Sequence, residues 1–132
     1  MPIVLDSSYA LALVLPDEQP PETAATVLDD DLIAPHLFPV EVANALLNGV
    51  RRKRYAASDA PDVCEAIERL SVGVLPASDL GAAHHLRIAQ AHGLTAYDAL
   101  YLDLALTRRC GMATRDKLMA DAARKAGVQV YS

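Results

Sequence analysis

The sequence has no apolar run that could cross a membrane and no apolar leader ahead of its first predicted strand. The longest apolar stretch, residues 9–15, is far shorter than the ~20 residues that a spanning helix needs. There is also no internal repeat and no low-complexity linker among the 132 residues. We therefore expect a single domain over residues 1–132, located in the cytoplasm and without a membrane partner.

The chain is also poor in cysteine and in basic charge. Its two cysteines, Cys64 and Cys110, lack the spacing of metal ligands, which favours incidental or buried thiols in a reducing compartment. Lys and Arg number 12 against 17 Asp and Glu, a net charge of −5, and this argues against a broadly basic nucleic-acid-binding surface. A nucleic-acid enzyme that relies on a metal ion and a few local cations is still compatible with this balance.

The residues that are present predict a folded α/β domain. Apolar residues make up 52% of the chain and charged residues 22%, as is typical of a globular protein with a sizeable core. Short apolar runs alternate with longer amphipathic segments, and the runs predict strands near residues 3–5, 32–35, 72–76, 111–114 and 128–130. This alternation favours a parallel sheet that is covered by helices on both faces.

Two acidic residues follow predicted strands directly. Asp6 ends the first strand and Asp116 comes just after a later one. Ligands gather at the carboxyl ends of parallel strands, where an acid is costly to bury without a counter-charge. Asp116 also suits the N-cap of the helix that it begins, and this role alone would explain it. That helix should end at Gly127 and bury Leu118, Ala122 and Ala126.

A long helix is expected from Pro39 to about Tyr55. Its apolar face, at offsets of three, four and seven, would consist of Ala43, Leu46, Leu47 and Val50. Glu41 lies in the first turn on a different, polar face, where an ordinary surface position near the helix N-terminus would explain it. The same face carries Asn44 and Asn48, which are mediocre helix formers and therefore call for another reason.

The predicted helix ends in a dense basic run, which consists of Arg51, Arg52, Lys53 and Arg54. Basic side chains near a helix C-terminus complement the helix dipole, which accounts for them structurally. Contact with RNA or with a protein partner is the alternative interpretation.

The most apolar helix is expected over residues 94–106, and it should be central because it is apolar nearly all round. Thr95 and Asp98 have the spacing of a variant capping box, which gives Asp98 a possible structural role. Asp103 lies about 140° further around the helix at ~100° per residue, so it cannot share a site directly with Asp98.

A further helix, capped by Ser78, should run to about His92. It carries three histidines, none of them spaced to place two imidazoles one turn apart. We expect ordinary, partly exposed histidines and no metal role for His84, His85 and His92.

Right-handed crossovers can bring four of these acids to one edge of the sheet: Asp6, Glu41, Asp98 and Asp116. Clustered carboxylates repel and raise one another's pKa unless a cation neutralises them. With no His or Cys ligand nearby, coordination by oxygen alone implies a hard ion, Mg²⁺ or Mn²⁺. Such an ion neutralises phosphate charge and generates hydroxide near neutral pH, as phosphodiester hydrolysis requires.

At these residues the chain resembles the PIN-domain ribonucleases, and most closely the VapC-type toxins of bacterial and archaeal toxin–antitoxin pairs. The resemblance covers essentially the whole chain. It rests on four motifs in order: IVLDSS at residues 3–8, PVEVANAL at 39–46, LTAYDALYL at 94–102 and ATRDKL at 113–118.

The resemblance implies a three-layer α/β/α sandwich with a central, mostly parallel sheet. It also implies metal-dependent endoribonuclease activity, with the four acids as the catalytic and metal-binding residues and Ser8, Asn44 and Thr114 in support. A homodimer and a small antitoxin that blocks the site are implied as partners, beside the RNA substrate. Asp103 departs from the pattern, because relatives usually carry a small or apolar residue at its position.

Two other functions remain as alternative hypotheses. Haloacid-dehalogenase-like phosphatases also place an Asp after their first strand, but they need a second Asp where this chain has Ser8. A non-catalytic PIN-fold module that only binds a partner would be marked by loss of an acid, and all four acids are present. The leading hypothesis is therefore a Mg²⁺- or Mn²⁺-dependent ribonuclease that acts as a toxin.

Overall fold

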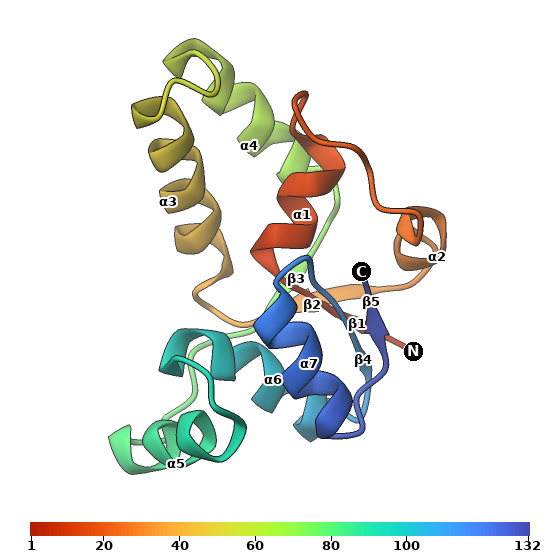
Figure 1. The fold of residues 1–132 in the computed structure, drawn as a ribbon, viewed down its shortest axis with the longest axis vertical. Coiled ribbons are helices and arrows are strands. Elements are labelled where there is room, and N and C mark those ends of the chain that lie inside the picture. Colours follow the sequence, from red (N-terminus) through yellow and green to blue (C-terminus); the bar gives the residue numbers. More distant parts are fainter.

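The computed structural model describes residues 1–132 and has a five-stranded parallel sheet at its centre (Figure 1). Along the sheet the strands follow the order β3-β2-β1-β4-β5, and every neighbouring pair is parallel. Val4 of the central strand pairs with Ile33 on one side and Met112 on the other. The strands are β1 (Ile3–Leu5), β2 (Leu32–Ala34), β3 (Gly73–Val74), β4 (Gly111–Ala113) and β5 (Val130–Tyr131).

Helices cover both faces of this sheet, so the predicted α/β/α sandwich is confirmed. Figure 1 shows α1, α3 and α4 on one side, with α5, α6 and α7 on the other. None of the helices has the length and apolar character to cross a membrane. The helices are α1 (Ser7–Val14), α2 (Ala24–Leu28), α3 (Phe38–Arg51), α4 (Ala60–Glu68), α5 (Ala82–His92), α6 (Ala96–Arg108) and α7 (Lys117–Lys125), with a 3-10 turn at Ala57–Asp59.

The order of the strands reverses between β1 and β4. The chain builds outward from β1 through β2 to β3, then returns to the other side of β1 for β4 and β5. In open α/β sheets the crevice at such a reversal, outside the carboxyl ends of the strands, is where ligands bind. The backbone N–H of Asp6, just past β1, donates to the Ala113 carbonyl of β4 at 3.0 Å. Residues that follow β1 and β4 are thus side by side at the reversal.

The core centres on β1 and α6. All three residues of β1 are buried, and α6 buries four side chains against the sheet, so the prediction that residues 94–106 form a central helix is confirmed. Burial of large apolar side chains contributes roughly 1.5–3 kcal/mol each, which makes these two elements the rigid frame of the molecule. The buried residues of α6 are Ala99, Tyr101, Leu102 and Ala105.

The apolar face predicted for α3 is largely wrong. Its buried residues are Phe38, Val42, Leu46 and Gly49, and only Leu46 was in the predicted set. Ala43 and Leu47 are exposed and line a groove between α3 and α4. Periodicity identifies an apolar face, but it does not say whether another element of the same chain covers that face.

The end of α3 also differs from the prediction. The helix stops at Arg51, four residues before Tyr55, because Lys53 adopts a left-handed backbone with φ of 58°. The Tyr55 ring folds back onto the helix, and its hydroxyl donates to the Leu46 carbonyl at 3.2 Å. A side chain at Gly49 would overlap this ring, so the close approach requires glycine there.

Two other helix predictions need correction. Helix α5 begins at Ala82 after Gly81, and the Ser78 hydroxyl accepts a hydrogen bond from the Leu80 N–H at 3.4 Å in the preceding turn instead of capping the helix. In α7, Ala122 is buried as predicted, but Leu118 is 72% exposed. This helix is rich in alanine, so two apolar faces were possible; the one that packs inward contains Met119, Ala120, Ala122 and Ala123.

Candidate active site

Asp6 is the buried centre of the candidate site. It lies just past β1, is 5% exposed, and its Oδ2 atom accepts hydrogen bonds from the Ser8 hydroxyl at 2.6 Å and the Thr114 hydroxyl at 2.7 Å. Each hydroxyl is itself fixed by a backbone donor, because Arg115 N–H donates to Ser8 and Asp116 N–H donates to Thr114, both at 3.0 Å. The two predicted supporting hydroxyls therefore contact Asp6 directly and orient it.

Burial raises the pKa of the Asp6 carboxyl, and the negative charge of Asp116 raises it further. The hydroxyl bonds from Ser8 and Thr114 oppose this shift, but burial is the largest influence. A buried carboxylate of this kind is destabilised in its charged form unless a cation comes close.

Glu41 reaches the same region from the first turn of α3. Its Oε1 atom accepts a hydrogen bond of 2.5 Å from the hydroxyl of Tyr101, which is fully buried on α6. Burial raises the pKa of Glu41, and the charges of Asp6 and Asp98 add to the increase, against the bond from Tyr101. Burial and the adjacent Glu41 carboxylate likewise raise the pKa of Tyr101, so its phenol stays protonated and donates.

Asp98 lies in the first turn of α6. Only half of the predicted capping box forms: the Thr95 hydroxyl accepts the Asp98 backbone N–H at 3.1 Å. No bond returns from the Thr95 N–H to the Asp98 carboxylate, so the cap does not require the carboxylate. Burial raises the pKa of this carboxyl, followed by the charges of Asp6 and Asp116, while the Thr95 hydroxyl lowers it.

Asp116 is the N-cap of α7, as predicted. Its Oδ1 atom accepts the Met119 N–H at 2.9 Å. Its charge nevertheless raises the pKa of both Asp6 and Asp98, which places it in the same cluster. The structure therefore places each of the four predicted acids within electrostatic range of others of the set, from four elements: the end of β1, the first turn of α3, the first turn of α6 and the start of α7.

None of the four acids has a basic partner. The ion pairs of the chain all use other residues, and no member of the cluster is among them. As the side chains stand, no three acidic, His or Cys groups are close enough together to hold one ion. Uncompensated carboxylates repel one another. The donor set, made only of oxygen and carrying excess negative charge, fits a hard divalent cation such as Mg²⁺ or Mn²⁺.

A cavity of about 430 Å³ opens beside Glu41 and Asp98. Asn44 contributes to its wall, as does Tyr97, whose side chain is 66% exposed. Asn44 thus lies next to two of the acids, and the apolar edge of the cavity is formed by Leu37 and Val40.

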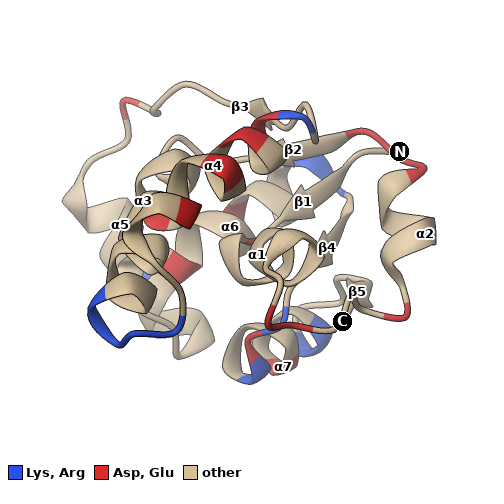
Figure 2. Ribbon diagram, turned by 90° about the horizontal axis from the view of Figure 1, so that it is seen from above, with Lys and Arg blue, Asp and Glu red and all other residues tan.

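The basic run at the end of α3 is not brought to the acids. Arg51 lies ten residues after Glu41, about 15 Å along the helix at ~1.5 Å per residue, and Figure 2 shows the run at the turn that follows α3. Arg54 is engaged in an ion pair with Asp17, with Nε and Nη2 at 3.0 and 2.9 Å from Oδ2. A contact between this run and RNA or a partner stays a prediction.

Two features of the site region escaped the sequence interpretation. Tyr101 was counted among the apolar residues of its helix, although its position three residues after Asp98 was a signal that both face the same side. The second is the partner of Asp103, which stays apart from the acids as predicted: its Oδ2 lies 2.9 Å from His84 Nε2 and links α6 to α5. Arg87 Nη2 lies 3.3 Å from His84 Nδ1.

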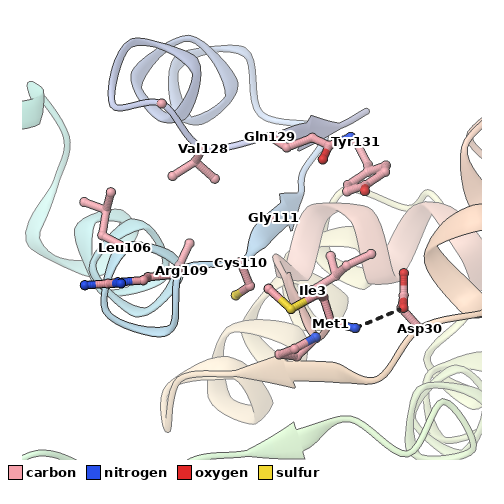
Figure 3. Close-up of a pocket in the computed structure, with 13 residues that line it drawn as sticks. Met1, Ile3, Asp30, Leu106, Arg109, Cys110, Gly111, Val128, Gln129 and Tyr131 are labelled. Carbon is pink, nitrogen blue, oxygen red and sulfur yellow. Dashed lines mark ion pairs between the residues drawn. The ribbon is translucent and has the colours of Figure 1, made fainter.

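A second cavity, of about 440 Å³, lies at the opposite edge of the sheet (Figure 3). Ile3, Cys110 and Gly111 line it, and beside it the Met1 amino group pairs with Asp30 at 3.7 Å. Cys110 is buried and free, as expected, and burial raises the pKa of its thiol. None of the four clustered acids reaches this cavity.

The sequence matches known proteins along most of its length. Residues 3–125 match the PIN domain family. The VapC ribonuclease Mb0985 of Mycobacterium bovis and the ribonuclease VapC9 of Mycobacterium tuberculosis are each 34% identical over 119 residues, which cover 90% of this chain and 89% of the relative.

Solved structures share the fold. The crystal structure of PAE2754 from Pyrobaculum aerophilum superposes with a TM-score of 0.73 at 24% identity, covering 98% of this chain and 83% of that one. FitAcB from Neisseria gonorrhoeae superposes with a TM-score of 0.63 at 21% identity, covering 98% and 96% of the two chains. At these identities the likeness concerns the fold alone.

Proposed function

Because this chain belongs to the PIN domain family and, within it, to the VapC-type proteins, we propose that it is a metal-dependent endoribonuclease acting as the toxin of a toxin–antitoxin pair. The observation that carries the proposal is the cluster of Asp6, Glu41, Asp98 and Asp116 around the strand reversal, with no basic partner. Family membership also removes the phosphatase-like alternative.

The four acids would hold Mg²⁺ or Mn²⁺, which when bound supplies charge neutralisation for the RNA phosphate and lowers the pKa of bound water. Asp6 is the most rigid of the four, because the Ser8 and Thr114 hydroxyls fix one of its oxygens. Glu41 is restrained by Tyr101. Without a cation the cluster would repel an RNA phosphate.

RNA attraction must be local, because the chain carries a net charge of −5. Arg115 and Lys117 flank Asp116 and are exposed, which suits contacts to flanking phosphates. Tyr97 offers an exposed ring beside Asp98, and RNA-binding proteins commonly stack unpaired bases on such rings. We therefore propose that a nucleotide next to the scissile phosphate occupies the cavity between Glu41 and Tyr97.

The groove between α3 and α4 suits the proposed antitoxin. Two cavities of about 750 and 250 Å³ lie along it and share three lining residues, Ala43, Cys64 and Glu68. Leu47 in its wall is 46% exposed. An amphipathic helix could bury its apolar face here, while an arginine from the same partner bridged two of the carboxylates in place of the metal.

The remaining proposals concern assembly and location. We propose a homodimer, which the family resemblance implies, and a cytoplasmic location, where RNA is available. Two free cysteines without a disulfide agree with a reducing compartment.

The test of the proposed function is RNA cleavage by the purified chain in the presence of Mg²⁺ or Mn²⁺, with and without a chelator. Internal cleavage that requires the metal and is abolished by the chelator would support the proposal. A chain that folds, binds Mn²⁺ and cleaves no RNA under any of these conditions would favour the non-catalytic partner module. Cleavage at the same rate in the chelator would contradict the metal requirement.

A further inference from the structure

Tyr101 connects two members of the acid cluster through the core. It lies on α6 three residues after Asp98, and its side chain is fully buried. Its hydroxyl donates to Glu41 Oε1 on α3 at 2.5 Å, across 60 residues of sequence. This single bond ties the helix that carries Asp98 to the side chain of Glu41.

Glu41 relies on this single bond to orient its carboxylate. Asp6 is oriented by two hydroxyls, and Asp116 by the Met119 N–H. Glu41 has the longest side chain of the four and therefore the most rotamer freedom to lose. The Tyr101 hydroxyl is the one hydrogen-bond donor to its carboxylate, and the ring that carries this hydroxyl is locked in the core.

We propose that Tyr101 is a positioning residue for the metal centre: its hydroxyl holds Glu41 Oε1 so that the other carboxylate oxygen is presented to a divalent cation. The inference rests on the proposed function of the four acids as a metal site. Groups that orient a metal ligand typically change metal affinity by about 10–100-fold when they are removed. A hydrogen bond from a hydroxyl to a carboxylate is stronger than one between neutral groups, because the acceptor carries charge.

A purely structural role is the competing explanation, since a buried phenol needs a hydrogen-bond partner wherever it lies. The chain contains a matched comparison in Tyr9. That residue is also fully buried, and its hydroxyl is 2.7 Å from the Thr23 hydroxyl, with no clustered acid involved. Tyr9→Phe and Tyr101→Phe each remove one buried hydroxyl and its bond, so both should lower stability, but only the second should affect metal binding.

The experiment is calorimetric titration of Mn²⁺ alone into the full chain, comparing wild type, Tyr101→Phe and Tyr9→Phe. We expect the affinity of Tyr101→Phe to fall by about 10–100-fold and that of Tyr9→Phe to equal wild type. Equal affinity in Tyr101→Phe and wild type, in a folded variant, would overturn the proposal. So would an equal loss in both variants, because a general destabilisation would then explain it.

A double-mutant cycle with Glu41→Gln tests whether Tyr101 acts through Glu41. If it does, adding Tyr101→Phe to Glu41→Gln should cause no further loss of Mn²⁺ affinity. A further loss of the same 10–100-fold would contradict action through Glu41. Should Tyr101→Phe not fold, Glu41→Asp tests the contact from the other side, because a carboxylate shortened by one methylene is drawn away from the Tyr101 hydroxyl. Wild-type affinity in Glu41→Asp would then overturn the proposal.

The outcome is separable from that of the ribonuclease proposal, because Mn²⁺ binding is measured without RNA. Weaker binding in Tyr101→Phe, with no RNA cleavage by wild type, would support the positioning role and contradict the ribonuclease function. Metal-dependent cleavage by wild type, with unchanged affinity in Tyr101→Phe, would support the ribonuclease function and contradict the positioning role.

Discussion

The two edges of the central sheet carry cavities of similar volume, about 430 Å³ beside the acids and about 440 Å³ at the amino-terminal edge. At the carboxyl edge, four acids lie together without a basic partner, and burial raises the pKa of Asp6, Glu41 and Asp98. At the amino edge, the acid Asp30 is already paired with the Met1 amino group. The amino edge therefore has a paired acid and the additional cation Arg109, whereas the acids clustered at the carboxyl edge have no basic partner.

This difference teaches that cavity size alone does not identify a functional site. The strand reversal places the residues that follow β1 and β4 side by side, and charges gathered there are costly without a ligand. Folds bear such a cost where function requires it, and this supports the proposal that the functional site lies at the carboxyl edge.

The largest expected effect is a loss of catalysis, and only a substitution at the carboxyl edge of the sheet should cause it. Asp98→Asn keeps the size of the side chain and the Thr95 cap, which uses the Asp98 backbone N–H. We expect RNA cleavage to fall by more than about 100-fold, because even groups that only orient a metal ligand are worth about 10–100-fold. The measurement is the cleavage rate at saturating Mn²⁺, with circular dichroism to confirm the fold.

The control is the same chemical change at the amino edge. Asp30→Asn removes a carboxylate that pairs only with the exposed chain terminus, and such surface pairs contribute about 0–1 kcal/mol. Its cleavage rate should stay near that of wild type. Equal losses in the two variants would break the distinction between the edges, and a fully active Asp98→Asn would remove Asp98 from the site.

A smaller effect is expected on substrate binding at the carboxyl edge. Tyr97→Ala should raise the KM for RNA by about 10-fold with little change in kcat, since stacking of a base on an aromatic ring is worth about 1–3 kcal/mol. Tyr97→Phe, which keeps the ring, should behave as wild type. Steady-state cleavage of one defined RNA separates KM from kcat.

Leu86→Ala is the control for loss of an exposed apolar side chain away from the cavity, on α5. It should leave both constants unchanged. A Tyr97→Ala variant with normal KM but an altered oligomeric state would show that the ring serves a dimer interface instead of RNA.

The smallest expected effect is on stability. Replacing a buried acid of the cluster should increase stability, whereas it should decrease activity. Without metal, Asp6→Asn should raise the free energy of unfolding at pH 7, because the neutral amide avoids the cost of burying the Asp6 charge. The sign follows from the raised pKa of Asp6. The folded state keeps the Asp6 proton to higher pH than the unfolded chain, so wild-type stability falls as pH rises above the ordinary Asp range.

The advantage of Asp6→Asn over wild type should therefore grow from acidic to neutral pH in urea unfolding of the metal-free proteins. Asp30→Asn should show no such growing advantage. A wild type that becomes more stable relative to Asp6→Asn as pH rises would mean that a cationic group of the protein already compensates Asp6.

Much of the fold and of the site was predictable from sequence, for local reasons. Asp6 and Asp116 follow short apolar strands, and Glu41 and Asp98 lie in the first turns of helices, so each acid is near the end of an element. Side chains that pair across elements were not predictable. Tyr101 looks like a core residue until its partner 60 residues away is placed, and Asp103 needs His84 from the neighbouring helix.

The face of α3 shows the same limit. Ala43 and Leu47 have the periodicity of core residues, but α4 stands away from them and leaves a groove. Periodicity reports that a face is apolar; whether the chain itself or a second molecule covers it depends on where the neighbouring helix packs.

The most direct test of the central claim is Mn²⁺ binding in the absence of RNA by wild type, Asp6→Asn and Asp30→Asn, measured by calorimetry. If the carboxyl edge is a metal centre, wild type and Asp30→Asn should bind Mn²⁺ saturably with equal affinity, and Asp6→Asn should lose this binding. Equal binding by all three proteins, or a wild type that binds no metal yet still cleaves RNA, would contradict a metal centre at the carboxyl edge.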